Sequence, residues 1–314
     1  MNRFWGLVFG LVLLGAFVLT AVSPLRHWWL PMSASSYAPE IDNLFYLILA
    51  IVAFFYVLTE VLLVFNIVHS GKLGRKSEFS HGDKRLELVW SIVPAAILIL
   101  IAVLQVKAWA NIKYPTHLVE SLDKGDSYLQ MGVEARQWEF RIRYPSPDHV
   151  SEWERDPASA VKDFKTRLNE RMDDIWMPND IHTWKDQKVL MHFKTRDVGH
   201  SLFFPNLRLK QDALPGRTIP VWFQATEANT RLSDANGQQS WSDGWKLGDR
   251  SQWTEDPNYV FDMVCTQYCG TRHSLMRGKL FVHPTKDDFL AWLRHARDLV
   301  NAKQAAPGTV SAFP

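Results

Sequence analysis

The sequence has few cysteines, almost no net charge and no internal repeat. Its 314 residues include only 2 Cys, which excludes a disulfide-dense secreted scaffold. The 35 Lys and Arg nearly balance the 33 Asp and Glu, so the chain lacks the basic excess typical of nucleic-acid-binding proteins, and we expect no nucleic-acid partner. The length is sufficient for one or two domains with their own cores.

Long charge-free runs are present instead, and they crowd into the first 110 residues. Residues 4–22, 43–68 and 88–106 are each long enough to cross a bilayer as a helix, and the second run contains one charged side chain, Glu60. The first run also resembles the apolar region of a signal peptide, so a cleaved signal and a retained helix both stay open. The chain therefore joins a membrane part to a water-soluble part.

The loop between the second and third runs sets the expected orientation. By the positive-inside rule its basic excess places it in the cytoplasm, and everything after about residue 110 then lies on the outer face. We expect an integral protein of the bacterial inner membrane whose C-terminal domain faces the periplasm. The loop carries five cations against two carboxylates: Lys72, Arg75, Lys76, Lys84 and Arg85 against Glu78 and Asp83.

Residues 111–314 form a neutral soluble part with 27 basic and 27 acidic side chains. Short runs of β-branched and aromatic residues, broken by Pro, Gly, Asn and Asp, predict an all-β sandwich or barrel. The runs are residues 128–133, 138–144, 188–194, 219–226, 259–265 and 278–283.

Two stretches interrupt this β pattern. Residues 146–185 are polar and predict partly helical structure, whereas residues 228–257 are rich in Asn, Asp, Gly, Gln and Trp and predict a long surface loop. The predicted domains are a signal or extra helix with linker at 1–42, a two-helix transmembrane hairpin at 43–110, a β domain with those two insertions at 111–300, and a disordered tail at 301–314.

Both cysteines lie in one short segment that carries the chemistry. Cys265 and Cys269 are followed by His273 and Met276. Two thiolates, an imidazole and a thioether form a soft ligand set suited to copper, and methionine makes zinc the weaker candidate. The four-residue spacing lets both sulfurs face one point, where they could bridge two metals. A buried thiol pair or a disulfide is the alternative.

A complete metal site needs a ligand from elsewhere in the chain. The first candidate is His200, which ends a strand-like run among apolar residues. His192 and His283 have strand-like surroundings and are further candidates. A lone histidine in such a run is more often structural.

Four separated motifs, in order, resemble subunit II of the haem-copper oxidases of the cytochrome c oxidase type. The resemblance covers residues 43 to about 295. The motifs are Glu87-Leu-Val-Trp90-Ser-Ile-Val-Pro94, Arg136-Gln137-Trp138-Glu139-Phe140, Asp197-Val-Gly-His200-Ser with Asp212-Ala-Leu-Pro215-Gly216-Arg217, and Cys265 to Met276.

This resemblance implies a cupredoxin-like domain that holds two coppers in a binuclear CuA centre. Cys265 and Cys269 would bridge them. The other ligands implied are His200 with Met276 on one copper, and His273 with the backbone carbonyl of Gln267 on the other.

Two further residues take roles from the resemblance. Trp138 corresponds to the aromatic residue that accepts electrons from cytochrome c, although a packed core tryptophan is the alternative reading. Glu87 corresponds to the mouth of a proton pathway, although an interfacial anchor explains it equally well. Glu60 matches no motif, and packing against a polar partner explains it as well as a function does.

The sequence departs from the family pattern in three ways. Gln267 stands where many members have Glu, which puts their interfacial magnesium site in doubt. The two insertions, residues 146–185 and 228–257, are extra. No Cys-x-x-Cys-His occurs, so a fused c-type haem is absent.

The implied function is that of an oxidase subunit that accepts electrons from cytochrome c or an equivalent donor and passes them to haem in subunit I. Oxygen reduction there would be coupled to proton translocation, so this chain is part of an oxidoreductase and does not reduce oxygen alone. Its other partners would be further membrane subunits and lipid. The alternatives are the CuA subunit of a nitric oxide reductase and a copper-less structural subunit of a quinol oxidase.

A cationic cytochrome c would call for acidic residues near Trp138. The insertion at residues 146–185 offers candidates, although such an acidic excess is more often a solvated face. They are Asp148, Glu152, Glu154, Asp156, Asp163, Glu170, Asp173, Asp174 and Asp180.

Overall fold

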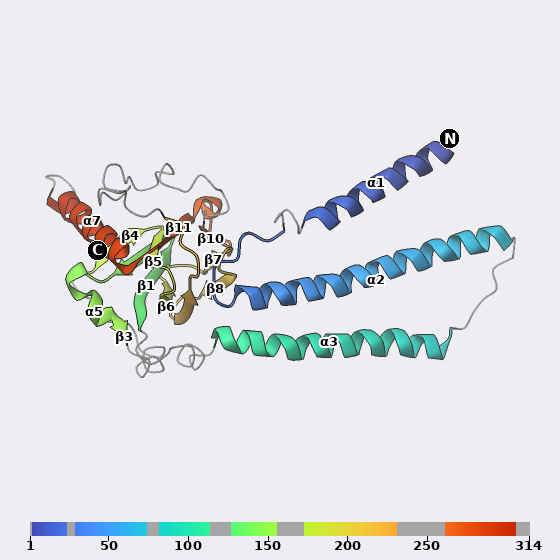
Figure 1. Ribbon diagram of the computed structural model, residues 1–314, viewed down its shortest axis with the longest axis horizontal. Coiled ribbons are helices and arrows are strands. Elements are labelled where there is room, and N and C mark those ends of the chain that lie inside the picture. The colour runs from blue at the N-terminus through green and yellow to red at the C-terminus, as the bar shows by residue number, and fades with distance from the viewer. Residues whose placement is uncertain are drawn as a thin grey trace. The chain divides into compact units, whose positions relative to one another are not determined.

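The computed structural model describes residues 2–23, 29–73, 82–113, 127–155, 173–230 and 261–305 (Figure 1). It divides into two units, residues 39–117 on the one hand and residues 1–38 with 118–314 on the other. Each unit is described in turn.

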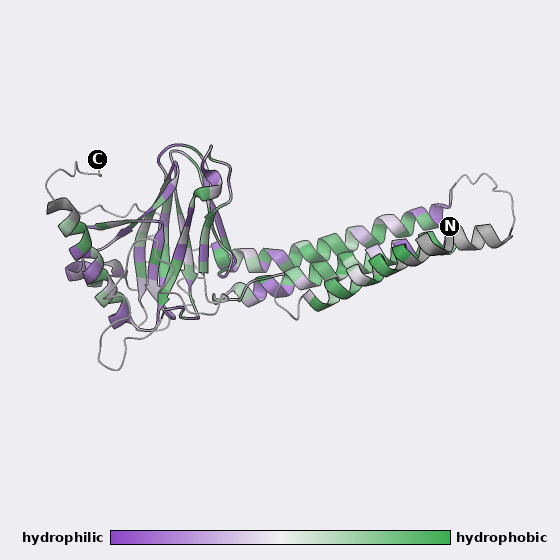
Figure 2. Ribbon diagram, turned by 90° about the horizontal axis from the view of Figure 1, so that it is seen from above, coloured by the Kyte–Doolittle hydropathy of each residue, from purple (hydrophilic) through white to green (hydrophobic). Residues whose placement is uncertain are grey.

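The apolar runs form long helices. They are α1 (Asn2–Val22), α2 (Ala38–Leu73) and α3 (Lys84–Lys113). Residues Ala38–Asn66 and Lys84–Lys113 are long and apolar enough to cross a membrane, and Figure 2 shows the apolar colouring along α2 and α3. Most of their described side chains are exposed, which suits a hydrocarbon surrounding rather than water.

Both α2 and α3 extend beyond the charge-free runs predicted from the sequence. The first turn of α3 is capped by Asp83, whose Oδ1 accepts the backbone N–H of Arg85 at 2.8 Å. At the other end of the pair, Asn111 donates through Nδ2 to Oε2 of Glu40 at 3.3 Å. Polar residues therefore complete the turns that project past the apolar spans.

The β domain is a sandwich of two sheets. The first has the order β4-β2-β1-β6-β9, with β3 added on β1, and the second has the order β5-β11-β10-β7-β8. The strands of the first sheet are β1 (Tyr128–Arg136), β2 (Glu139–Tyr144), β3 (Glu154–Arg155), β4 (Ile175–Pro178), β6 (Lys188–Thr195) and β9 (Thr218–Gln224). Those of the second are β5 (Asp180–Trp184), β7 (His200–Phe204), β8 (Leu209–Ala213), β10 (Phe261–Cys265) and β11 (Arg277–His283).

Aromatic and aliphatic side chains fill the space between the sheets. Phe204 of β7 meets Phe223 of β9 with ring centroids 6.2 Å apart, and both rings are almost fully buried. Met131, Phe140 and Phe193 are buried on the first sheet. The predicted fold class, apolar helices followed by an all-β sandwich, is confirmed.

Two core strands lie within the stretch predicted as a polar, partly helical insertion. Residues 146–185 begin with the short helices η2 (Pro147–His149) and α5 (Val150–Trp153) and end with β4 and β5. These strands are too short for a clear alternation in the sequence. Residues 156–172, between β3 and β4, lie outside the described residues, as does most of the predicted loop at 228–257.

A C-terminal helix that the sequence analysis did not anticipate closes the domain. Helix α7 (Lys286–Ala305) buries Phe289, Trp292, Leu293 and Ala296, the i, i+3, i+4, i+7 spacing of one helix face. It continues to Ala305, so the predicted disordered tail at 301–314 begins as helix. The residues after Ala305 lie outside the described part of the chain.

The predicted linker packs on the β domain. Ser35 forms a β-bridge with Ala225, and the backbone N–H of Ala34 donates to the carbonyl of Asn206 at 2.9 Å. Tyr37 rests edge-on against Trp222, with ring centroids 5.6 Å apart. The chain is thus anchored to the sandwich just before α2 begins.

Two buried histidines join α7 to the second sheet. His182 stacks on Trp292 with centroids 3.6 Å apart, and its Nδ1 lies 3.0 Å from Nε2 of His283. Burial lowers the pKa of His283 to about 3, and burial together with His283 lowers that of His182. Both imidazoles are therefore neutral in the folded domain.

We expect the β domain to lose stability as the pH falls below about 6.5. Below that pH the unfolded chain binds a proton on His283 that the folded domain does not bind until about pH 3, which costs about 1.4 kcal/mol of stability per pH unit. Burial also lowers the pKa of His182, which acts in the same direction. Chemical unfolding of the intact protein at several pH values measures this slope. His283→Gln should flatten it; an unchanged slope would show that these imidazoles do not govern the acid sensitivity.

Candidate metal centre

The candidate ligands converge at the end of the second sheet where β10 ends and β7 and β11 begin. Cys265 ends β10 and lies opposite Leu202 of β7, so the start of β7 brings His200 beside it. The chain then loops through Cys269 and η6 (His273–Leu275) to Met276, which directly precedes β11. The backbone N–H of Cys265 donates to the carbonyl of Met276 at 3.1 Å, closing the base of this loop.

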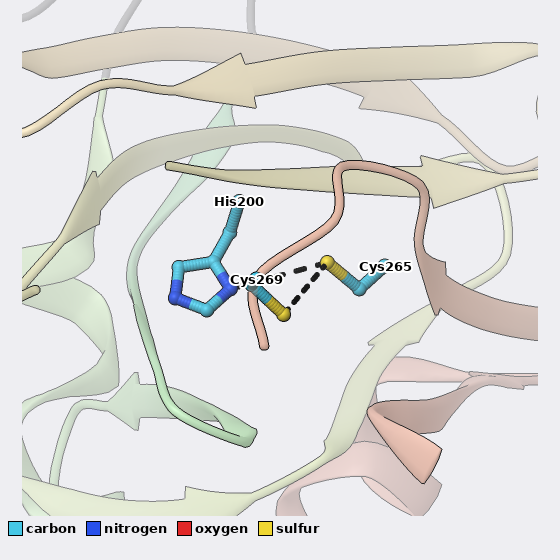
Figure 3. Close-up of side chains that lie close together, drawn as sticks. All are labelled: His200, Cys265 and Cys269. Atoms are coloured by element: carbon cyan, nitrogen blue, oxygen red, sulfur yellow. Dashed lines mark hydrogen bonds between the residues drawn. The ribbon is translucent and has the colours of Figure 1, made fainter. Parts of the chain in front are cut away.

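The donor atoms of these side chains point toward one another. The two Sγ atoms are 3.9 Å apart, and Nδ1 of His200 lies 3.9 Å from Sγ of Cys265 (Figure 3). Sγ of Cys269 is 3.6 Å from Nδ1 of His273 and 3.8 Å from Sδ of Met276. The carbonyl oxygen of Gln267 is 3.3 Å from Sγ of Cys265. His200, Cys265 and Cys269 form a group able to hold a metal ion.

These separations match a metal site better than a disulfide. A disulfide needs its sulfurs about 2.05 Å apart, far less than the 3.9 Å found, and both cysteines are free. Two ligands at tetrahedral positions around an ion, with bonds of about 2.0–2.3 Å, lie roughly 3.3–3.8 Å apart. Soft sulfur and imidazole donors at such spacing fit copper.

The centre is screened from water on its inner side. The exposed fractions are 0% for His200, 8% for Cys265, 3% for Cys269 and 1% for Met276. His273 is half-buried, and the side chain of Gln267 is exposed while its carbonyl faces inward toward Cys265. A bound ion would therefore sit at the edge of the sandwich, beneath a thin loop.

One carboxylate orients the upstream histidine. Nε2 of His200 lies 2.8 Å from Oδ1 of Asp197, which leaves Nδ1 facing the thiols. Asp197 also accepts the backbone N–H of Gln137 at 2.7 Å and that of Val198 at 2.7 Å. Burial by itself raises the pKa of Asp197, but these hydrogen bonds outweigh it and lower the pKa. Such an outer partner selects the tautomer of a ligating histidine.

The pKa values of the two thiols shift in opposite directions. Burial opposes the thiolate of Cys265, but hydrogen bonds with His200 and with the backbone of Ser201 and Gln267 lower its pKa overall. Burial and the negative charge of Cys265 raise the pKa of Cys269. The pair alone therefore favours one thiolate, and a cation is needed to hold both as thiolates.

Trp138 lies directly against the metal loop. Its Nε1 donates to the carbonyl of Cys269 at 3.2 Å, and Nε2 of Gln137 donates to the same oxygen at 2.9 Å. Gly270 has a φ of +117°, and a Cβ there would lie 3.2 Å from Nε1 of Trp138, so glycine permits this approach. Trp138 is half-buried, which differs from the packed core tryptophan considered as its alternative.

The remaining candidates lie elsewhere. His283 is at the far end of β11 in the aromatic cluster under α7, and His192 is buried on β6 of the other sheet. Glu87 is exposed in the first turn of α3, and Glu60 is exposed on α2. None of these four joins the donor group at Cys265.

Among the described side chains, the acidic residues considered as a cytochrome-docking face do not line the surface around Trp138. Asp148 pairs with Arg297 of α7, Glu154 with Lys286, and Asp173 with His149. Asp174 pairs with Arg143 at 3.6 Å, and Asp180 belongs to β5. The side chains of Glu152, Asp156, Asp163 and Glu170 lie outside the described part of the chain.

Sequence reasoning missed the parts that support the ligands. Asp197 stands three residues before His200 in the quoted motif, and Gln137 precedes Trp138, yet neither position indicates its partner. Their contacts depend on how the loop before β7 meets the β1–β2 turn. The contact between these two loops can be recognised only in the folded β sandwich.

Known proteins match both parts of the chain. Residues 25–107 match the family model described as the cytochrome c oxidase subunit II transmembrane domain. A cytochrome c oxidase subunit 2 of Thermostichus vulcanus is 24% identical, over 88% of this chain and 81% of that relative. An alternative cytochrome c oxidase subunit 2 of Bradyrhizobium diazoefficiens is 22% identical, over 93% of this chain and 91% of that one.

Among solved structures, the periplasmic domain of subunit II of a cytochrome oxidase of Bradyrhizobium japonicum is 16% identical. It covers 55% of this chain and 96% of its own, with a TM-score of 0.36. The family model and the sequence relatives span the apolar helices and the β domain, and they confirm the resemblance found in the motifs: this chain is a relative of cytochrome c oxidase subunit II.

Proposed function

We propose that this chain is the electron-accepting subunit II of a haem-copper oxidase. It takes electrons from cytochrome c or an equivalent donor at a binuclear copper centre and delivers them to haem in subunit I, where oxygen is reduced and protons are translocated. The observation that carries the proposal is the convergence of two cysteines, two histidines and a methionine, with donor atoms 3.6–3.9 Å from their neighbours.

The ligand set divides between the two ions as follows. Cys265 and Cys269 would be shared by both ions, His200 and Met276 would hold one of them, and His273 and the carbonyl of Gln267 would hold the other. The Nδ1 atoms of both histidines, the carbonyl of Gln267 and Sδ of Met276 each lie within 3.9 Å of a cysteine sulfur, so all four donors are within reach of a shared site. The magnesium site of the family lacks its carboxylate here, because the amide of Gln267 replaces it and points outward.

The fold holds the candidate ligands in place and keeps water away from them. When bound, a copper pair bridged by thiolates supplies one-electron transfer with little change of geometry. His200 and Cys265 lie on paired strands and Met276 directly precedes a third, so the sheet fixes the positions of these three ligands, and the loop between β10 and β11 carries the other two. Asp197 keeps His200 in one tautomer, and burial of Cys269 and Met276 keeps water from the inner side.

Trp138 is the point at which electrons enter the chain. Its indole N–H bonds directly to the carbonyl of Cys269, so one hydrogen bond links a partly exposed ring to a ligand residue. The apolar helices hold this domain at the membrane beside subunit I, other membrane subunits and lipid. Glu87, at the start of α3, serves the mouth of a proton pathway, and the β domain faces the periplasm of a bacterial inner membrane.

A copper-less structural subunit is the less favoured alternative. A chain without copper has no need to bury two thiols against two imidazoles, because such polar groups weaken a core unless they have a partner.

We expect Cys269→Ser to abolish rapid electron acceptance. In the assembled oxidase mixed with a reduced c-type cytochrome, the wild-type copper absorbance should bleach before the haem is reduced. The variant should lose that absorbance and reduce its haem at least about a hundredfold more slowly. Ser274→Ala, an exposed change in the same loop, is the matched control. Equal haem reduction in Cys269→Ser would contradict the proposal.

Asp197→Asn should weaken copper binding by about ten- to a hundredfold, because the amide is a poorer acceptor for Nε2 of His200. Competition with a chelator of known copper affinity measures the loss. Asp287→Asn, exposed on α7, should leave the affinity unchanged. If both variants bind copper as the wild type does, Asp197 does not orient the ligand.

A further inference from the structure

Trp138 lies in a surface depression of about 780 Å³ beside the metal loop. Arg136 and Glu139 line it from the β1–β2 turn, Arg196 and Asp197 from the loop before β7, and Arg272 and Leu275 from the metal loop. Three separate segments thus meet around one half-buried ring. This is the face from which a redox partner reaches the indole.

The two carboxylates of the depression are committed to internal partners. Glu139 forms an ion pair with Arg136. Asp197 binds Nε2 of His200 and two backbone N–H groups. Neither acid is therefore available to receive the lysines of a cationic partner without breaking a contact of its own.

Two arginines of the depression, Arg196 and Arg272, are exposed to solvent. The guanidinium of Arg272 lies 5.9 Å from the centroid of the Trp138 ring. Among the described residues that line the depression, three arginines stand against two carboxylates. The rim of the depression is therefore basic.

Apolar side chains accompany this rim. In the β domain, over residues 127–155, 173–230 and 261–305, the large hydrophobic side chains that are well exposed are Val198, Leu214, Tyr268 and Leu275, at 39%, 53%, 74% and 72%. All four belong to loops at the edge where β7 and β11 begin and β8 and β10 end. Exposed apolar side chains gathered beside charged groups on one face of a domain mark a protein–protein interface.

We propose that this basic depression, with its apolar border, is the docking site of a small soluble redox protein whose contact face is acidic. Charge complementarity steers such a partner to Trp138, whereas a donor with a basic face is repelled by Arg196 and Arg272. The inference rests on the proposed function, since it names the class of donor for that same site. The sequence analysis considered a cationic donor, whereas this depression favours an anionic one.

The proposal is tested by measuring how tightly two soluble c-type cytochromes bind to the assembled oxidase. The two have similar redox potentials, but one is anionic and the other cationic at neutral pH. The dissociation constant of each oxidised cytochrome is measured by biolayer interferometry at about 0.01 M and about 1 M salt. We expect the anionic cytochrome to bind about tenfold more tightly than the cationic one at low salt, and the difference to vanish at high salt.

Arg196→Glu and Arg272→Glu should each weaken binding of the anionic cytochrome by about five- to tenfold and strengthen binding of the cationic one. Arg196 has no contact with the ring of Trp138 among the described interactions, so its variant separates charge from any effect on the indole. Arg294→Glu, exposed on α7, is the matched control and should change neither constant. An unchanged copper absorbance shows that each variant is folded.

Tighter binding of the cationic cytochrome, or no response to either arginine variant, would overturn the acidic donor. Loss of subunit I from the purified variants would also overturn it, because the face would then be a subunit interface. Trp138→Phe distinguishes a failure of the proposed donor class from a failure of the proposed function. If it slows reduction by both cytochromes while the arginine variants do nothing, the proposed function stands and the donor class fails; if no cytochrome reduces the wild-type enzyme, both fail.

Discussion

The antiparallel pairing of β10 with β7 is the constraint on which the rest of the site depends. It places Cys265 opposite Leu202, and so brings His200, 65 residues away in the sequence, to 3.9 Å from the cysteine sulfur. The pairing of β10 with β11 then returns the chain to Met276 on the same edge. A slip of one residue in either register would turn these side chains to the opposite face of the sheet. The ligand set is therefore as stable as the core that holds the two strands in register.

The same edge joins the ligands to the surface. Asp197 binds His200 on one side and the backbone of Gln137 on the other, and the next residue, Trp138, bonds to the carbonyl of Cys269. The upstream histidine, the cysteine loop and the exposed aromatic ring thus share one hydrogen-bonded network.

The sequence predicted the local parts of this arrangement and missed the parts that depend on distant segments. Cys265, Cys269, His273 and Met276 were recognisable because their spacing within one short loop already brings the donors together. His200 needed the motif around it, since a single histidine before a strand has many structural uses. The roles of Asp197 and Gln137, and the basic character of the face around Trp138, follow from loops that meet only in the sandwich. In the fold, the long apolar runs predicted α2 and α3, whereas β4, β5 and α7 were missed because short strands and a moderately polar helix leave weak periodic signals.

The central claim is that this chain holds a pair of coppers that share an electron. The most direct measurement is copper stoichiometry together with an electron paramagnetic resonance spectrum of the intact, copper-loaded protein. We expect two coppers per chain and one unpaired electron spread equally over both. One copper, zinc or no metal would contradict it, and would leave the domain with a structural role beside its membrane partner.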